Sequence, residues 1–511
     1  MAIFCAEGAP GTGKTTLAFK IYKQAEEEGL SVCYETFRRN MAQDFIRRIG
    51  HRDYWVGTTH SICFRLLKLE YHYTLKNVAD SEVWDEFCRK VGIPVDPTEL
   101  KKDITHIDEL TTPGAKIYTI YSNCVNTMTS FDDWDELPPR MKPNLEPKYV
   151  YMVTEVIDKW ISYLERENLI DFPMMLMKAF ELKLTPPTDI YIADEFQDKT
   201  PIQYELFKLW SKDKHSVVVL GDVSQCIYSF WGTSPKFFYE VRRRSKFKVL
   251  SPSWRLSKQV YDCACQLLRM SNQEVFDVDC VGKTTLMEID FHRVFDVLKE
   301  CRNVMLITRT NYHLYIIANH LRNYGIPFVG RFGWTEKQYV LYKFIWKYRN
   351  KIEPIYKSEL LEYLKASNAY PPSTLKFIKI SLQNELRIQD VDNYLPNYHK
   401  VVLNSSADPF KLLNLDEKQL NDMRTAFKNN HPPRTDILLT TIHGAKGLEA
   451  DVVIVFDGIT KRIMQTMMQD HEEYLNEYRV WFVALTRVKK TCFVVRYAPI
   501  KYSMPFLPRL N

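Results

Sequence analysis

Residues 8–15 read Gly-Ala-Pro-Gly-Thr-Gly-Lys-Thr, a complete G-x-x-x-x-G-K-[ST] phosphate loop. An apolar run at 2–6 precedes it, and apolar residues at helical spacing follow it over 14–28, which is the strand–turn–helix context that this pattern requires. Backbone N–H groups of such a loop cradle phosphate oxygens, Lys14 reaches the β- and γ-phosphates, and Thr15 supplies a hydroxyl to Mg²⁺. We expect a nucleoside triphosphate to contact the loop and the residue after it: Gly8, Ala9, Pro10, Gly11, Thr12, Gly13, Lys14, Thr15 and Thr16.

A pair of carboxylates, Asp194 and Glu195, directly follows the apolar run 190–193. In phosphoryl transfer an aspartate at a strand end holds the metal, and a neighbouring carboxylate positions the attacking water. Alone, an acidic pair at a strand end is equally typical of a solvated terminus. Together with the phosphate loop it predicts hydrolysis of a magnesium-bound nucleoside triphosphate, with Asp194 and Thr15 as metal ligands and Glu195 as the residue that polarises water.

The composition is that of a globular protein with several domains. The 511 residues are 45% hydrophobic and 26% charged, with a net charge of +6. Basic clusters at 38–39, 47–48 and 242–244 permit nucleic-acid binding, although each is also typical of a solvated helix face. Eleven cysteines without a C-x-x-C pair exclude an obvious zinc site and favour a reducing compartment. Since there is no signal peptide and no apolar run of membrane length, we expect a soluble intracellular protein, in the cytoplasm or nucleoid (the host cell if viral), without a membrane partner.

Strand and helix patterns alternate over two parts of the chain, which predicts an α/β protein with parallel sheets. In the first part, strands are expected at 2–6, 30–35, 54–58, 189–193, 215–220 and 247–250. In the second part, strands are expected at 303–308, 326–329, 436–441, 452–456 and 491–496. A mostly helical segment interrupts each part, at 67–160 and at roughly 340–432.

An ordered series of motifs resembles that of the UvrD/Rep-type superfamily 1 DNA helicases and covers nearly the whole chain. After the phosphate loop, the matching segments are Thr36-Phe37 with Met41-Ala42, residues 58–67 (TTHSICFRLL), 169–172 (LIDF), 194–198 (DEFQD), 221–232 (GDVSQCIYSFWG), 253–257 (SWRLS), 441–449 (TIHGAKGLE) and 477–487 (EYRVWFVALTR). Three positions depart from the family pattern: Trp231 and Thr16 stand where arginines are usual, and Pro173-Met174 stands where a second acid is expected.

The resemblance implies two tandem RecA-like P-loop domains with parallel sheets, each carrying a mostly helical insertion. On this basis we expect the first domain to comprise 1–66 and 161–255 with its insertion at 67–160. We expect the second to comprise 256–339 and 433–511 with a short insertion at 340–432.

The resemblance also implies roles at the nucleotide. Arg255 and Arg487 would deliver positive charge to the γ-phosphate when the domains close, and Gln225 would sense that phosphate. Together with Lys14 and Glu195 they are the expected catalytic residues. Glu449 would contact the ribose, and Trp254 would stack on the base.

Family positions that face single-stranded DNA are occupied by Phe37, Tyr228 and Phe230, with His60 and Arg65 beside them. Aromatic faces suit a single strand because every base offers a π-face. Thr441 and His443 lie where the family couples DNA to nucleotide. Each aromatic alone is also typical of a core position.

The leading hypothesis is therefore an ATP hydrolase that acts as a helicase, moving 3′ to 5′ on single-stranded DNA, with ATP and Mg²⁺ as cofactors. Two alternatives stay open: an ATP-driven single-strand-binding or remodelling protein that does not unwind duplex, and a nucleotide switch with a protein partner. Expected partners are single-stranded DNA and single-strand/duplex junctions, with replication or repair proteins as candidates, and we expect a monomer.

Overall fold

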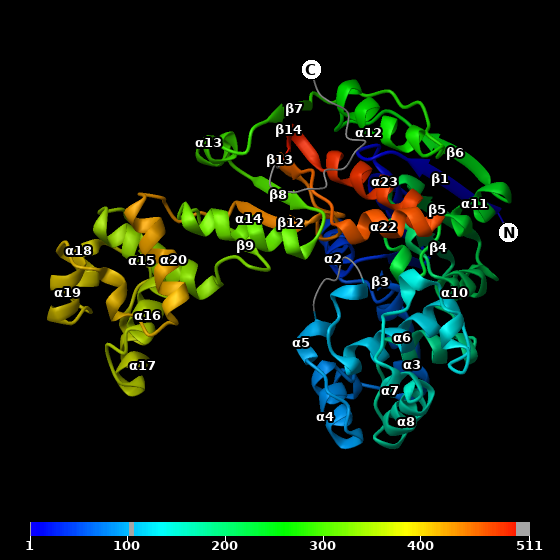
Figure 1. The fold of residues 1–511 in the computed structure, drawn as a ribbon, viewed down its shortest axis with the longest axis horizontal. Helices are drawn as coiled ribbons and strands as arrows, with labels where there is room; N and C mark the ends of the chain where they lie inside the picture. The colour runs from blue at the N-terminus through cyan, green and yellow to red at the C-terminus, as the bar shows by residue number, and fades with distance from the viewer. Residues whose placement is uncertain (1, 102–106, 497–511) are drawn as a thin grey trace.

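The computed structural model describes residues 2–101 and 107–496, and within these ranges the chain forms two six-stranded sheets and a two-stranded ribbon (Figure 1). All strand pairings in both large sheets are parallel. Helices connect the strands, so the chain is built from two tandem RecA-like α/β domains, the predicted fold class. None of the helices in this described part has both the length and the apolarity needed to cross a membrane.

The first sheet has the order β3-β2-β4-β5-β1-β6. Its strands are β1 (Ala2–Gly8), β2 (Val32–Thr36), β3 (Val56–Thr58), β4 (Ile190–Ala193), β5 (Ser216–Gly221) and β6 (Lys246–Leu250). Its flanking helices are α1 (Lys14–Glu27), α2 (Arg39–Ile49), α3 (Thr59–Tyr71), α9 (Phe172–Glu181), α10 (Pro201–Ser211) and α11 (Lys236–Arg243). Because the strands are parallel, their carboxyl ends meet at one edge, where the phosphate loop and the acidic pair both lie.

A helical body is inserted between α3 and α9. It contains η1 (Leu75–Asn77), α4 (Ser81–Val91), α5 (Pro97–Leu100), η2 (Ile107–Glu109), α6 (Pro113–Thr127), η3 (Trp134–Glu136), η4 (Pro139–Met141), α7 (Pro147–Val150) and α8 (Val153–Arg166). Its buried side chains form one cluster with those on one face of the first sheet.

The carboxylate of Asp171 joins this insertion to the first domain. It caps α9 by accepting from the backbone N–H of Met174 at 2.9 Å, and it also accepts from the Trp160 indole at 2.8 Å and the Tyr121 hydroxyl at 3.1 Å. Three helices, α6, α8 and α9, therefore converge on one buried acid.

The second sheet has the order β7-β14-β13-β8-β12-β9. Its strands are β7 (Thr285–Ile289), β8 (Val304–Thr308), β9 (Val329–Gly330), β12 (Ile437–Thr441), β13 (Ala450–Phe456) and β14 (Val488–Val495). Its helices are α12 (Lys258–Met270), α13 (Arg293–Glu300), α14 (Asn311–Asn323), α21 (Ile442–Ala445), α22 (Lys461–Gln469) and α23 (His471–Leu485).

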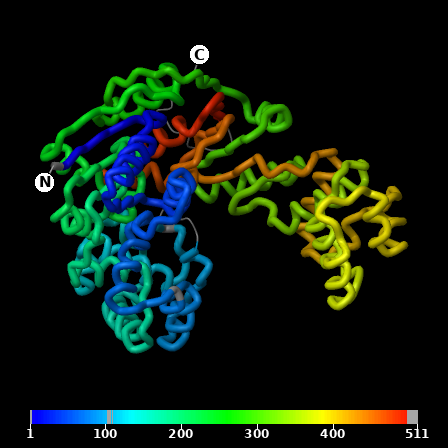
Figure 2. The backbone as a smooth tube through the Cα atoms, turned by 180° about the vertical axis from the view of Figure 1, so that it is seen from behind, coloured from blue at the N-terminus to red at the C-terminus, as the bar shows by residue number. Residues whose placement is uncertain are grey.

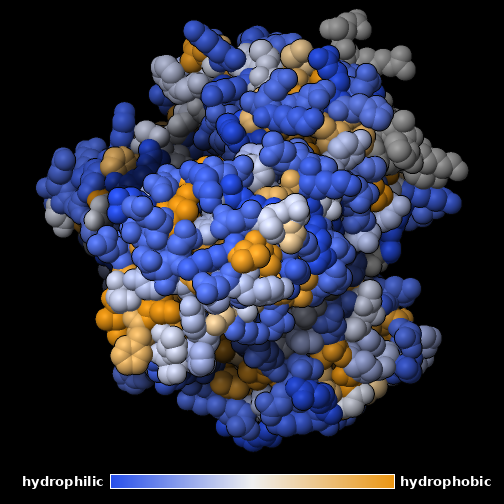
Figure 3. Space-filling view, turned by 90° about the vertical axis from the view of Figure 1, so that its left-hand side faces the viewer, coloured by the Kyte–Doolittle hydropathy of each residue, from blue (hydrophilic) through white to orange (hydrophobic). Residues whose placement is uncertain are grey.

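The second insertion has a hydrophobic core of its own. It contains α15 (Glu336–Arg349), β10 (Ile355–Tyr356), α16 (Lys357–Ala366), α17 (Pro372–Ser381), β11 (Glu385–Leu386), α18 (Ile388–Asp392), α19 (Asn397–Asn404), η8 (Pro409–Leu412) and α20 (Glu417–Lys428). Figures 1 and 2 show it projecting away from both sheets and from the first insertion. The side of the molecule on which this insertion projects is mainly hydrophilic, with separate apolar patches (Figure 3).

The strand predictions were close for most of both sheets, with three differences. β7 was not predicted, β9 covers only Val329–Gly330 rather than 326–329, and β14 begins at Val488 rather than at 491. The proposed insertion boundaries cut through elements, since α8 continues to Arg166 and α15 begins at Glu336. The exact limits of the two domains and their insertions stay a prediction.

Candidate functional site

A cavity of about 580 Å³ lies between the two sheets, and its walls come from both. It is lined by Pro10, Gly11, Thr12, Gly13, Lys14, Thr15, Thr16, Phe37, Arg38, Met41, Asp44, Arg47, Arg48, Glu195, Asp198, Gln225, Arg255, Lys446, Gly447, Glu449 and Arg487. All five predicted catalytic residues belong to this set. Gly8, Ala9, Asp194 and Trp254 are not in the lining.

The phosphate loop needs glycine at two positions for different reasons. Gly13 has φ +85° directly before α1, a left-handed conformation that glycine adopts without strain. Gly11 also has positive φ, and a Cβ there would lie 2.6 Å from the Cβ of Arg255. The loop thus packs tightly against the segment that carries Arg255, and the backbone N–H of Trp254 donates to the carbonyl of Gly11 at 3.0 Å.

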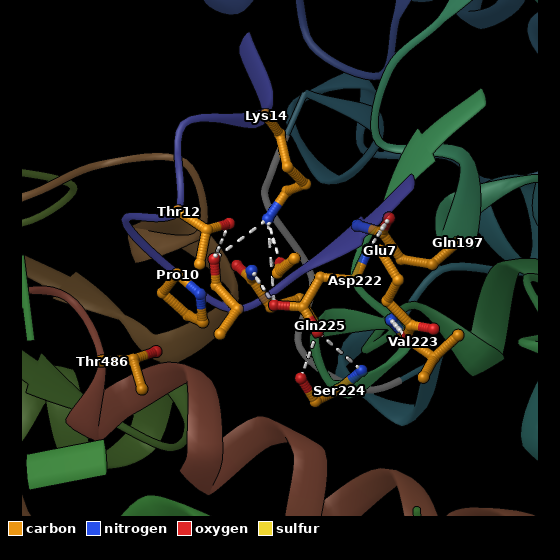
Figure 4. A network of polar contacts seen from close by, with 12 residues as sticks. Glu7, Pro10, Thr12, Lys14, Gln197, Asp222, Val223, Ser224, Gln225 and Thr486 are labelled. Carbon is orange, nitrogen blue, oxygen red and sulfur yellow. Dashed lines mark hydrogen bonds and ion pairs between the residues drawn. The ribbon is translucent and has the colours of Figure 1, made fainter. Parts of the chain in front are cut away.

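The Lys14 ammonium lies inside the loop and donates to the carbonyl of Gly8 at 2.5 Å. Figure 4 shows it pointing toward Asp222, whose carboxylate is 4.0 Å away. The same carboxylate accepts from the Gln225 amide at 2.6 Å and from the backbone N–H of Ser224 at 3.1 Å. Asp222 therefore fixes the lysine and the glutamine relative to each other.

Thr15 and Asp194 are the residues that could hold a divalent cation. The Thr15 hydroxyl donates to the Asp194 carboxylate at 3.2 Å, and the Tyr34 hydroxyl donates to the same oxygen at 2.8 Å. Burial and the adjacent Glu195 raise the pKa of Asp194 to about 6. A cation beside a hydroxyl, a carboxylate and the phosphates suits Mg²⁺, which binds through few protein ligands and keeps several waters.

Glu195 stays ionised although it is half-buried in the cavity lining. Burial acts to raise its pKa, but Lys14 and Lys446 outweigh that effect, so the pKa lies below its usual value. The Gln197 amide donates to this carboxylate at 2.5 Å. A charged, oriented carboxylate in the lining is what a water-polarising residue requires.

Two arginines bring positive charge to the cavity. Arg487 donates to the Gln225 side-chain oxygen at 2.8 Å and to the carbonyl of Val483 at 3.1 Å. Arg255 forms an ion pair with Glu449, and its Nε has no hydrogen-bond partner. Burial, and then the charge of Arg487, lower the pKa of Arg255 to about 9. Burial lowers the pKa of Arg487 to about 10, so both side chains are cations at pH 7.

Three other predicted nucleotide contacts have different surroundings in the structure. Glu449 lines the cavity but is paired with Arg255 and lies 3.5 Å from the Lys489 ammonium. Thr16 accepts from the Arg48 guanidinium at 3.2 Å. The Trp254 side chain is 70% exposed and stands outside the lining, so its stacking role remains a prediction.

A second cavity of about 540 Å³ lies between the first domain and its insertion. It is lined by Phe37, Arg38, Arg39, Thr59, His60, Glu99, Leu100, Leu110, Tyr118, Thr119, Ser122, Asn123, Asn126, Phe172, Pro173, Thr200, Gln203, Trp231 and Thr233. Phe37 and His60 are thus the two predicted DNA-binding residues that it brings together. Phe37 and Arg38 line both cavities and form part of the wall between them.

The other predicted DNA-binding side chains are occupied elsewhere in this arrangement. Tyr228 and Phe230 are only 1% and 5% exposed, because they pack under the second domain beside His443, so neither offers a free face to a base. The Arg65 guanidinium donates to the backbone carbonyl of Val56 at 3.0 Å, which stabilises the start of β3. The Thr441 hydroxyl caps α21 by accepting from the backbone N–H of Gly444 at 3.1 Å.

His443 is buried, and its Nε2 lies 3.1 Å from the carbonyl of Ile227. Burial first, and then the nearby arginines, lower its pKa well below the usual value, so the ring is neutral. It contacts Tyr228 and Phe230 and therefore lies at the junction of the two domains rather than in the second cavity.

Arg38 was predicted only as part of a basic cluster and Lys446 had no predicted role, yet both residues join the two domains. Arg38 donates to the carbonyls of His443 at 2.9 Å and Lys446 at 3.0 Å, and contacts the Tyr228 hydroxyl. The Lys446 ammonium binds the Asp198 carboxylate. Both lie inside matched motifs, so motif position was the available signal, but their partners are set by domain docking.

The chain matches two family models. Residues 4–246 match the UvrD/REP helicase N-terminal domain, and residues 335–498 match the UvrD-like helicase C-terminal domain. These two matches fall on the two halves of the fold that enclose the first cavity.

Individual relatives carry helicase names. A probable DNA helicase II homolog of Mycoplasma pneumoniae is 22% identical over 620 aligned positions, covering 97% of this chain and 82% of that protein. The ATP-dependent DNA helicase PcrA of Staphylococcus epidermidis is 24% identical over 296 positions (52% of this chain, 37% of PcrA). The ATP-dependent DNA helicase UvrD2 of Mycobacterium tuberculosis is 43% identical over 88 positions (17% of this chain, 13% of UvrD2). Since both domain models match and together cover more than half of the chain, this protein belongs to the UvrD/REP family of DNA helicases, and that membership implies an enzyme that binds ATP and DNA.

Proposed function

We propose that this protein is an ATP-driven DNA helicase that translocates 3′ to 5′ along a single strand and unwinds duplex. The observation that supports it most is that the catalytic groups come from both domains and meet in one cavity, with Arg487 of the second bonded to Gln225 of the first. Hydrolysis then depends on domain closure, which a motor needs. The direction rests on the family resemblance.

The site residues suggest how hydrolysis proceeds. Lys14 leaves its loop carbonyl to contact the β- and γ-phosphates, and Arg255 and Arg487 stabilise the charge that develops on the transferred group. Glu195 orients the attacking water in line. Mg²⁺, held by Thr15 and Asp194, would neutralise phosphate charge. Gln225 lies between Arg487 and Asp222, so it can report the state of the γ-phosphate to both domains.

The strand would occupy the second cavity, where Phe37 and His60 lie with hydroxyl and amide groups of α6. Its wall is shared with the nucleotide cavity through Phe37 and Arg38, and Arg38 holds the carbonyls at the end of α21. We propose this contact as the route by which strand binding alters closure.

A second candidate is an ATP-driven remodelling protein that moves on a single strand without opening duplex. It is favoured by the second insertion, which stands away from the first insertion rather than beside it (Figure 2).

Hydrolysis assays with single-stranded DNA of increasing length test the proposal, with Glu195→Gln as the inactive control. We expect strong stimulation that rises with strand length. Hydrolysis that DNA does not stimulate would favour a nucleotide switch with a protein partner and contradict both motor functions.

A further inference from the structure

Trp231 lines the second cavity, although its role was not predicted. It ends η7 (Ser229–Trp231), and its half-buried indole lies flat on Tyr228, with ring centres 4.9 Å apart and planes 12° apart. Phe37, which lines the same cavity, lies 6.4 Å from the indole. Two aromatic side chains therefore form one continuous part of the wall.

The ring behind this wall is held firmly. Tyr228 is 1% exposed, its hydroxyl donates to the carbonyl of His443 at 3.1 Å, and Arg38 contacts the same hydroxyl. Because Tyr228 supports one face of the indole, Trp231 loses little freedom when a flat ligand settles on it. Such preorganised aromatic surfaces bind at low entropic cost.

The rest of the cavity also suits a nucleotide strand. His60 and Phe172 line it with ring centres 5.7 Å apart, and the exposed Arg39 adds a positive charge. An indole differs from a cationic side chain in what it recognises. It binds the π-face of a base and is insensitive to salt, whereas a cation binds phosphate and releases counterions.

We infer that Trp231, next to Phe37, is a base-stacking subsite for single-stranded DNA, so that this point of the strand is held by its nucleobase rather than by its phosphate. The inference rests on the proposed function, because it assigns the strand to the second cavity. Tyr228 and Phe230 were the predicted stacking residues, but both are buried, whereas the Trp231 side chain is accessible.

An abasic scan tests the subsite. A set of oligonucleotides, each lacking one base at a successive position but keeping every phosphate, is titrated against wild type and Trp231→Leu by fluorescence anisotropy. Leucine keeps apolar volume but has no π-face. We expect Trp231→Leu to bind the intact strand about 5- to 150-fold more weakly. The base removal that most weakens wild type should cost nothing further in this variant.

Two further variants separate stacking from other roles. Trp231→Arg should become insensitive to the abasic position and gain about 0.7 in the slope of log affinity against log salt. Tyr151→Ala removes an 88% exposed aromatic outside the cavity lining and should match wild type throughout. A Trp231→Leu variant that binds like wild type, or that keeps the full abasic penalty, would overturn the subsite alone. Wild type that binds no single strand would overturn the proposed function as well.

A measurement on the unaltered protein guards against variants that fail to fold. Oligonucleotides carrying 5-iodouracil are photocrosslinked to wild type, and the attached residue is located by mass spectrometry. Attachment at Trp231 or Phe37 supports the inference, and attachment that is confined to other parts of the chain overturns it.

Discussion

The Arg487 guanidinium donates a 2.8 Å hydrogen bond to the side-chain oxygen of Gln225, which joins the second domain to the first inside the first cavity. Gln225 in turn donates to Asp222 at 2.6 Å, and Asp222 faces Lys14. One polar chain therefore runs from the arginine of one domain to the phosphate-loop lysine of the other. Movement of the second domain would therefore shift the polar groups that surround Lys14.

Replacing Arg487 with alanine should lower DNA-stimulated turnover by about 10³-fold while ATP still binds, because the arginine acts mainly on charge that develops in the transition state. Steady-state hydrolysis and equilibrium binding of a fluorescent ATP analogue measure the two effects. Lys490→Ala, which removes an exposed cation on β14 just after Arg487, is the matched control. Near-normal turnover in Arg487→Ala would show that this arginine is structural.

Lys14→Ala and Glu195→Gln should both abolish turnover by different routes. Loss of the lysine removes a contact to the bound phosphates and weakens ATP binding. Loss of the Glu195 charge leaves Lys14, Lys446 and Arg487 less neutralised, so ATP should bind as well as before or more tightly. Titration with the same ATP analogue distinguishes them, and an equal fall in affinity would contradict these roles.

Arg38→Ala should uncouple the two cavities. Without the contacts to the carbonyls of His443 and Lys446, strand binding near Phe37 no longer reaches the second domain. The factor by which single-stranded DNA stimulates hydrolysis should fall about fivefold or more, the size of a typical coupling energy. Arg89→Ala, at an exposed arginine of α4, is the control. An unchanged stimulation factor would rule out Arg38 as the coupling residue.

Asp171 should make folding pH-dependent. Burial raises its pKa from 3.8 to about 6, against hydrogen bonds from Met174, Trp160 and Tyr121, so the folded state binds the extra proton between those pH values. Its contribution to the free energy of unfolding is complete below pH 4 and is lost as the pH rises through 6, a change of up to about 3 kcal/mol. Asp171→Asn removes this term. Urea unfolding at pH 4.5 and 7.5 compares the two proteins, and parallel pH dependence would refute the assignment.

The sequence predicted which groups meet around the first cavity, because most of them follow apolar strands of a parallel sheet. Lys14, Asp194 and Glu195 lie where β1 and β4 end, and local rules place such residues at one edge. The interface between the domains was not predictable in the same way. Tyr228 is covered and Trp231 is partly open because of how the second domain docks. Neither the periodicity nor the spacing of the sequence contains that information.

Whether the protein unwinds DNA in the 3′ to 5′ direction is decided by strand displacement with ATP and Mg²⁺ on matched duplexes with a 3′ or a 5′ single-stranded tail. We expect ATP-dependent unwinding of the 3′-tailed duplex, little unwinding of the 5′-tailed one, and none of either by Glu195→Gln. Preference for the 5′ tail would contradict the direction. Strong DNA-stimulated hydrolysis without displacement of either strand would contradict helicase action and leave the remodelling function.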